Sequence, residues 1–183
     1  MPPRASFREF RKGRDDDALI DLLTTETWPL RAQPRFTRAE VEEELASGQY
    51  GEGKDLTFLI EVEDEVVGLV RLEGIDEPRF DPALDIRFRA AWRGRGLGVE
   101  AVRFITTEFF RRHPDRFRIE GQTRRDNLPM RKVFQRAGWV KEAVYRAAWA
   151  PDETGARRDG LGYAILRSDW ESATTTPPDL SPP

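Results

Sequence analysis

The sequence predicts one α/β domain of the α+β kind, in which helices flank a mixed, mostly antiparallel twisted sheet. Two observations lead to this fold class. Strand-like and helix-like segments follow one another as β, α, α, three strands, α, β, α and two closing strands. At 183 residues the chain is also long enough for one sizeable core, and it contains no internal repeat.

The first third of the chain predicts a short strand and two helices. Ser6–Phe10 alternates as a strand does, and Arg14–Glu26 has leucines at helical spacing behind aspartates that favour the helix N-terminus. A loop over residues 27–35 follows and is broken by two prolines. Thr37–Glu40 forms a capping box that begins a second helix, which continues through Ala46.

The middle of the chain predicts three strands and a long helix. Thr57–Glu61 and Val66–Gly74 are joined at Glu63–Asp64, which indicates a hairpin. Ala83–Phe88 alternates apolar and charged residues, as a half-buried strand does. An amphipathic helix is expected from Leu97 to Arg112, ending before a proline.

The last third predicts a strand, a helix and two closing strands. The expected strand is Arg116–Thr123 and the helix is Leu128–Ala137, with Gly138 as its C-cap. The closing strands are Val140–Trp149 and Gly160–Arg167, with a turn at Asp152–Gly155.

The chain divides into a folded domain over residues 1–171 and a tail. Residues 172–183 are rich in proline and threonine with almost nothing to bury, which predicts disorder.

The composition of the chain argues against several classes of function. The net charge is −3 and no basic face is evident, so nucleic acid is not an expected partner. The chain has no cysteine, which excludes disulfides, zinc–thiolate sites and thiol catalysis. It shows neither a signal peptide nor an apolar run of membrane-spanning length, so we expect a cytoplasmic protein without a membrane partner. Arginine outnumbers lysine 26 to 4, so a single arginine is weak evidence for anion binding.

The most informative segment is Arg93–Gly98, which places glycines between a strand and the N-terminus of a helix. Free N–H groups and the helix dipole make such a turn an anion cradle. A dinucleotide fingerprint would need glycine where Val99 stands, and Val99–Glu100 cannot act as the Lys–Ser/Thr pair of a Walker loop. A tight turn without a ligand is the simpler alternative.

Three motifs together resemble the GNAT superfamily of N-acetyltransferases over roughly residues 6–171. Arg93, Gly96 and Gly98 fit its (Gln/Arg)-x-x-Gly-x-(Gly/Ala) signature. The segment "DNLPMRKVFQRAGW" looks like the family's next motif, and "GLGYAILRSDW" resembles the closing strand of the ribosomal-protein N-terminal (Rim-type) branch. The resemblance implies a GNAT-like fold.

The resemblance also implies acetyl-CoA as cosubstrate, no metal, and direct attack by an amine on the thioester without a covalent enzyme intermediate. The pyrophosphate would lie in the cradle and the pantetheine arm along the strand before it. The residues expected to bind the cosubstrate are Phe88, Arg89, Arg93, Gly94, Arg95, Gly96, Leu97, Gly98, Val99, Asn127 and Phe134.

The chain departs from the family where catalytic groups are usual. Phe134 stands in the slot of the tyrosine acid and Met130 in that of a serine, so both usual proton donors are missing. Either the thiolate leaves unassisted or is protonated by water, or Tyr145 (more than Tyr163) protonates it. Core packing is the simpler expectation for both tyrosines.

A base is also needed, because the attacking amine must lose a proton. Gln122 stands where a glutamate is often found, and it can orient a water or an amine. Glu120, on the same strand face as Gln122, is the first candidate base and Asp85 the second. The simpler alternative for both carboxylates is a solvated or salt-bridged strand residue.

The acceptor is expected to be a primary amine, either a protein N-terminus or a small amine. The loop over residues 27–35 offers Trp28 and Arg31 as substrate contacts, although Trp28 could equally pack the loop on the core. As a set, the five tryptophans (Trp28, Trp92, Trp139, Trp149 and Trp170) are expected mostly in core or edge packing. The apolar stretch "VYRAAW" would allow a homodimer.

Two other functions remain open at this point. An acyl-CoA-binding sensor or interaction domain without catalysis is favoured by Phe134, Met130 and Gln122. A nucleotide-phosphate binder without CoA chemistry is disfavoured by the glycine spacing.

Overall fold

The computed structural model describes residues 4–51, 53–151 and 155–179. Within these ranges seven strands form one sheet in the order β1-β2-β3-β4-β5-β7-β6. The strands are β1 (Ser6–Glu9), β2 (Leu56–Val62), β3 (Glu65–Glu73), β4 (Ala83–Phe88), β5 (Arg118–Arg124), β6 (Val140–Tyr145) and β7 (Gly160–Leu166). The helices are α1 (Asp16–Thr25), α2 (Arg38–Ala46), α3 (Leu97–Arg112), α4 (Leu128–Arg136) and α5 (Arg167–Ser172), with a 3-10 turn at Ala90–Trp92. None of the helices in the described ranges is long and apolar enough to cross a bilayer.

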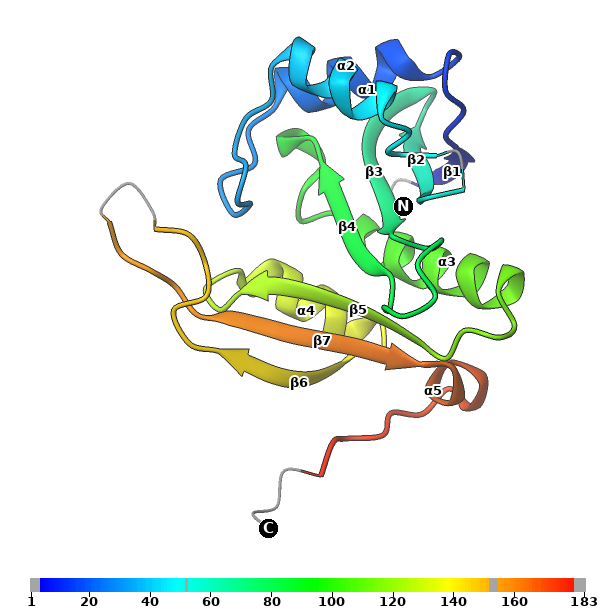
Figure 1. The fold of residues 1–183 in the computed structure, drawn as a ribbon, viewed down its shortest axis with the longest axis vertical. Helices are drawn as coiled ribbons and strands as arrows, with labels where there is room; N and C mark the ends of the chain where they lie inside the picture. The colour runs from blue at the N-terminus through cyan, green and yellow to red at the C-terminus, as the bar shows by residue number, and fades with distance from the viewer. Residues whose placement is uncertain (1–3, 52, 152–154, 180–183) are drawn as a thin grey trace.

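All strand pairs are antiparallel except β4 and β5, which are parallel. The parallel pair is joined by α3, the crossover helix that parallel neighbours require. The expected fold class, a mostly antiparallel mixed sheet flanked by helices, is therefore confirmed (Figure 1).

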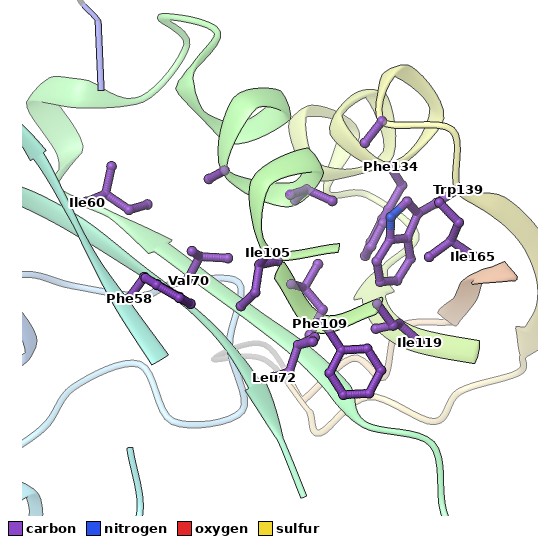
Figure 2. Packing of buried hydrophobic residues seen from close by; sticks show 14 of the residues in the cluster. Phe58, Ile60, Val70, Leu72, Ile105, Phe109, Ile119, Phe134, Trp139 and Ile165 are labelled. Carbon is purple, nitrogen blue, oxygen red and sulfur yellow. The ribbon is translucent and has the colours of Figure 1, made fainter. Parts of the chain in front are cut away.

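Helices cover the sheet from both sides, and each side has its own core. Alternation along β2 sends Phe58 and Ile60 into the core beneath α3 and α4, and sends Leu59 into the core beneath α1 and α2. Figure 2 shows the first core, in which Phe58 and Val70 lie near Ile105 of α3, and Phe134 of α4 lies beside Trp139. The first core holds α3 and α4 on one face of the sheet, and the second holds α1 and α2 on the other.

Several local expectations are confirmed by the backbone. The capping box is present, with Thr37 and Glu40 bonded to each other's main-chain N–H. Glu63 and Asp64 both adopt left-handed φ values, 51° and 64°, as the two central residues of a tight hairpin turn do. The long helix begins at Leu97 and ends at Arg112, as expected.

Other boundaries differ from expectation. β6 ends at Tyr145 and not at Trp149, because Ala147 has a φ of 50° and its N–H donates to the Asp159 carboxylate, which turns the chain. β5 begins at Arg118, two residues later than expected. Helix α5, which follows β7, was not expected. Apart from Gly155, the turn at 152–155 lies outside the described residues.

The segment after α5, described as far as residue 179, is hydrogen-bonded to that helix. The buried carboxylate of Asp169 accepts hydrogen bonds from the main-chain N–H and the hydroxyl of Thr176. Residues 180–183 of the expected tail lie outside the described residues, and the division at residue 171 stays a prediction.

Candidate active site

The site begins where β4 and β5 separate. Their Cα atoms pair only at Ala83 and Glu120, and the Glu120 N–H donates to the carbonyl of Pro82 at 3.1 Å. Beyond this point the strands diverge, as Figure 1 shows, although each stays paired with its other neighbour. The result is a wedge-shaped gap inside a continuous sheet.

The edge of β4 that faces the gap carries main-chain groups that no neighbouring strand pairs. The Arg89 N–H donates to the Val67 carbonyl, so residues 89, 87 and 85 point their main-chain groups toward β3. Antiparallel alternation then turns those of Ile86 and Phe88, beyond the Ala83–Glu120 pair, into the gap. These groups form a strip suited to hydrogen bonding an extended ligand.

Two arginine side chains contact this strip. Arg31, from the loop between α1 and α2, donates to the Ile86 carbonyl at 2.6 Å. Arg93 donates to the Phe88 carbonyl at 2.9 Å and to the Thr27 carbonyl at 3.0 Å. The α1–α2 loop is thereby connected to the strip at two points.

The strip leads to the glycine turn before α3. Gly94 and Gly96 have φ values of 75° and 89°, in the left-handed region that favours glycine, and Gly96 is the N-cap of α3. Gly98 serves close packing, because a Cβ there would lie 3.0 Å from the Val133 methyl group of α4. The first N–H groups of α3 are thus presented at the end of the strip, which is anion-binding geometry.

The remaining residues expected to bind the cosubstrate differ in position. Arg89 points away from the gap, with its guanidinium bonded to Asp21 and Thr25 of α1. Arg95 is exposed and lies 4.7 Å over the ring of Trp92. The geometry favours a structural role for the Arg89 side chain and leaves Arg95 free to meet an anion at the cradle.

The N-terminus of α4 borders the gap from the β5 side. Asn127 caps the helix by accepting from the Met130 N–H, and its amide donates to the Thr123 hydroxyl at 3.0 Å. Phe134 is buried and stacks on Tyr163, with ring centroids 4.5 Å apart. Gly121 makes room for this ring, because a Cβ there would lie 2.8 Å from it. Asn127 and Phe134 are thus both fixed at the gap.

A small cavity of about 80 Å³ lies in the gap. Its lining combines apolar side chains with a few polar ones, the usual character of a binding site. The lining residues are Leu30, Arg31, Leu84, Ile86, Gln122, Thr123, Asn127, Met130, Phe134 and Trp149. The structure therefore brings Arg31, Gln122, Asn127 and Phe134 together, as the sequence suggested.

Glu120 lies on the sheet face that α3 and α4 leave uncovered, the same face as Gln122. Its carboxylate accepts from Arg118 at 2.9 Å, and Arg118 also pairs with Asp81 and Glu142. Burial lowers the pKa of Arg118, but the hydrogen bonds that it donates to the three carboxylates outweigh burial and raise that pKa. Three carboxylates around one guanidinium leave this surface negative. Glu120 itself does not line the cavity.

Asp85 lies on the same sheet face as Glu120 but is enclosed beneath Arg31 of the α1–α2 loop. It is 3% exposed and pairs with Arg31 at 2.5 Å, Arg87 at 3.1 Å and Arg71 at 3.4 Å. Burial alone would raise the pKa of Asp85, but the three guanidinium groups overcome it and hold the pKa well below its usual range. A carboxylate so strongly stabilised in its charged form is a poor base.

For Trp28 the packing alternative holds, whereas Trp149 takes a position that the sequence did not suggest. Trp28 is buried and donates to the Leu23 carbonyl, so it packs the loop on the core and does not line the cavity. Trp149, expected in core or edge packing, reaches the cavity from the segment after β6. Nothing in the local sequence marks Trp149, because the turn at Ala147 directs it there.

The two candidate tyrosine acids differ in burial: Tyr163 is buried in the core, as expected, whereas Tyr145 is 43% exposed, against the expectation of core packing. Tyr163 is stacked behind Phe134, and the ring of Tyr145 lies over Gly162, whose added Cβ would be 3.1 Å from it. Neither side chain lines the cavity. In the described part of the chain no group of three or more metal-binding side chains was found.

Comparison with known proteins gives this geometry a family. The model of the acetyltransferase (GNAT) domain matches residues 4–140. No curated protein sequence matches the chain. Solved structures share its fold at low sequence identity.

Three of these structures illustrate the similarity. The ribosomal L7/L12 α-N-protein acetyltransferase RimL, in complex with coenzyme A, is 18% identical, with a TM-score of 0.75 over 88% of this chain and 93% of that one. The spermidine N-acetyltransferase of Vibrio cholerae, in complex with CoA and spermine, is 18% identical, with a TM-score of 0.74 over 91% and 98%. A GNAT-family acetyltransferase of Streptococcus pneumoniae is 19% identical, with a TM-score of 0.71 over 89% and 99%. With the divided β4–β5 pair and the glycine turn before α3, the match over residues 4–140 shows that the chain belongs to the GNAT acetyltransferase family.

Proposed function

We propose that the protein transfers an acetyl group from acetyl-CoA to a primary amine. The observation that carries this proposal is the strip of β4 main-chain groups that no strand pairs, which ends at the first N–H groups of α3. An extended ligand with amide groups along its length and a phosphate at one end fits such a surface. A carbonyl oxygen has two lone pairs, so those of Ile86 and Phe88 can accept from a ligand amide while Arg31 and Arg93 stay bonded.

Acetyl-CoA supplies an activated acyl group: the amine nitrogen bonds to the thioester carbon, the C–S bond breaks and the thiolate leaves. The residues of the cradle, Gly94 to Val99, hold the pyrophosphate. Asn127 and Phe134 border the arm from the β5 side. A main-chain N–H on the open edge of β4 stabilises the developing oxyanion.

The acceptor amine approaches from the face that carries Gln122 and Glu120. The surplus of carboxylates around Arg118 attracts an ammonium ion to this face. Gln122 orients the amine at the cavity, and Glu120 removes its proton through a water. Asp85 acts by positioning Arg31. The acceptor is a protein N-terminus or a small amine.

The first test measures binding. Thermal unfolding is followed with acetyl-CoA, CoA or ATP, because ligands of the native state raise the unfolding temperature with concentration. Stabilisation by the CoA compounds alone supports the proposal. A response to ATP alone, or to none of them, overturns it.

The second test measures turnover. Free CoA is detected with a thiol reagent, and since the chain has no cysteine the protein itself gives no signal. The acceptors are spermidine, a peptide with a free N-terminus and, as control, the same peptide with its N-terminus acetylated. Binding of CoA without transfer to any free amine would instead support the acyl-CoA sensor, which the missing proton donors at Phe134 and Met130 favour.

The role of Glu120 has a matched control. Glu120→Gln is expected to lower kcat about 100-fold, the usual size of a lost general base, with CoA affinity unchanged. Glu142→Gln removes another carboxylate partner of Arg118 and is expected to keep kcat within about twofold. Equal effects of the two substitutions would show that only the charge of the surface matters.

A further inference from the structure

A second, larger hollow lies beside α4, outside the gap between β4 and β5. Its volume is about 450 Å³, within the range of small-molecule sites. We call it the α4 trough and define it by its lining residues, Leu128, Arg131, Lys132, Gln135, Trp139, Lys141 and Tyr163.

The α4 trough and the cavity use different faces of the same helix. Asn127, Met130 and Phe134 are three and four residues apart and share the face toward the gap. Leu128, Lys132 and Gln135 show the same spacing on another face. From the sheet, Lys141 of β6 joins them, because it pairs with Tyr163 of β7 and shares its face. The trough is thus separate from the cavity.

The charge of the α4 trough is entirely positive. Three of its lining residues are cationic and none carries a carboxylate. Arg131 donates to the Arg125 carbonyl. The side-chain ammonium groups of Lys132 and Lys141 make neither a hydrogen bond nor an ion pair within the described residues. On the opposite face of the sheet, by contrast, Arg118 is surrounded by carboxylates. Unneutralised cations around a hollow favour an anionic ligand.

The use of lysine is itself unusual for this chain. It contains four lysines against 26 arginines, and two of the four line the α4 trough. A general preference for arginine therefore does not explain these two cations. Beside them the trough offers apolar surface from Leu128, which is 55% exposed, and the edge of Trp139, which is otherwise buried. An anion with an apolar or aromatic body matches both parts.

We propose that the α4 trough binds a small phosphorylated molecule. Its phosphate lies between Lys132 and Lys141, and its body packs on Trp139 and Leu128. Tyr163 connects the two sites, because it lines the trough and stacks on Phe134, which lines the cavity. This inference does not depend on the proposed acetyl transfer.

The test uses 1-naphthyl phosphate as probe, with calorimetry on the full chain at low salt and saturating CoA. We expect binding that weakens as salt is added, since exposed charge pairs are screened. 1-Naphthol, which lacks the phosphate, and inorganic phosphate, which lacks the ring, should each bind at least about tenfold more weakly. Lys132→Gln and Lys141→Gln should each weaken binding about threefold or more.

Lys54→Gln is the matched control, because Lys54 is exposed and its ammonium donates to the Ser47 carbonyl, outside the trough. It should leave the affinity for the probe unchanged. Equal affinities for all three variants and the wild type would overturn the proposal. So would binding seen only without CoA, since the trough would then belong to the cosubstrate's own footprint. Inorganic phosphate binding as tightly as the probe would show an unspecific anion site and overturn it as well.

Discussion

The guanidinium of Arg31 connects the α1–α2 loop to two neighbouring residues of β4, Asp85 and Ile86. It donates to the main-chain carbonyl of Ile86 at 2.6 Å and lies 2.5 Å from the carboxylate of Asp85. One side chain therefore connects the cavity wall to a buried ion cluster. The carboxylate of Asp85 therefore has a structural role in holding Arg31, whereas Glu120 is the proposed base.

Asp85→Asn is expected to destabilise the fold strongly. Removing the carboxylate leaves the buried guanidinium of Arg87 without its carboxylate partner, although Arg71 keeps Asp55 and Glu73. Breaking a buried pair in this way typically costs about 3–5 kcal/mol of unfolding free energy. Glu120→Gln breaks a solvent-exposed pair and should cost at most about 1 kcal/mol. Urea unfolding of both variants measures the difference. An Asp85→Asn protein of wild-type stability that has lost turnover would instead make Asp85 catalytic.

Arg31→Met should loosen the loop without unfolding the domain. The methionine keeps an apolar stem but cannot bond the Ile86 carbonyl, so amide hydrogen exchange in residues 26–36 should become faster. Arg38→Met is the control, because Arg38 makes only an exposed i,i+4 pair with Glu42. Unchanged exchange in Arg31→Met would show that Arg93 alone holds the loop.

Asp15 should make the protein sensitive to acid. Burial raises the pKa of Asp15, but hydrogen bonds from Arg14, the Arg11 N–H and Arg8 outweigh it and lower the pKa from 3.8 to about 2. A lowered folded-state pKa stabilises the fold above the unfolded value, and this contribution, about 2 kcal/mol, is lost as pH falls from about 4 to 2.

The check is the free energy of unfolding as a function of pH. Asp15→Asn should be less stable than the wild type at pH 7, and the two curves should converge near pH 2. Asp17→Asn, at an exposed position in the same helix, should follow the wild-type curve. A difference between Asp15→Asn and wild type that persists at pH 2 would assign the effect to packing and not to charge.

Gly121→Ala should disturb the wall of the cavity. The added Cβ would lie 2.8 Å from the Phe134 ring, which cannot retreat because it is stacked on Tyr163. We expect a loss of about 2 kcal/mol, the usual cost of overpacking. Phe134→Leu in the same chain should restore part of this loss, because leucine leaves room for the methyl group. Additive losses in the double variant would exclude the steric explanation.

Trp149→Ala should change the choice of acyl donor. Removing the indole enlarges the cavity. The ratio of kcat/KM for propionyl-CoA to kcat/KM for acetyl-CoA should therefore rise about tenfold, which is the usual discrimination that a pocket makes for one methylene group. Trp149→Phe keeps a ring and should leave the ratio close to that of the wild type. An unchanged ratio in Trp149→Ala would place the acyl group away from Trp149.

The sequence by itself determined the features that depend on neighbouring residues. Thr37 and Glu40 lie three residues apart, so the capping box follows from spacing alone, and the glycines before Leu97 mark the start of α3 for the same local reason. The family motifs are also local, which is why the cradle and Asn127 could be named in advance.

Only the tertiary structure decided which side chains meet. Asp85 and Glu120 look alike along the chain, as charged residues on strand faces. Asp85 is nevertheless buried against Arg87 of its own strand and against Arg31 and Arg71 from other segments, whereas Glu120 is half-exposed and pairs with Arg118. Trp149 and the α4 trough depend equally on where a turn and a helix face come to lie. Such contacts are set by long-range packing. The residue pattern of a single strand or helix predicts which face is buried but not which side chains of other elements will contact it.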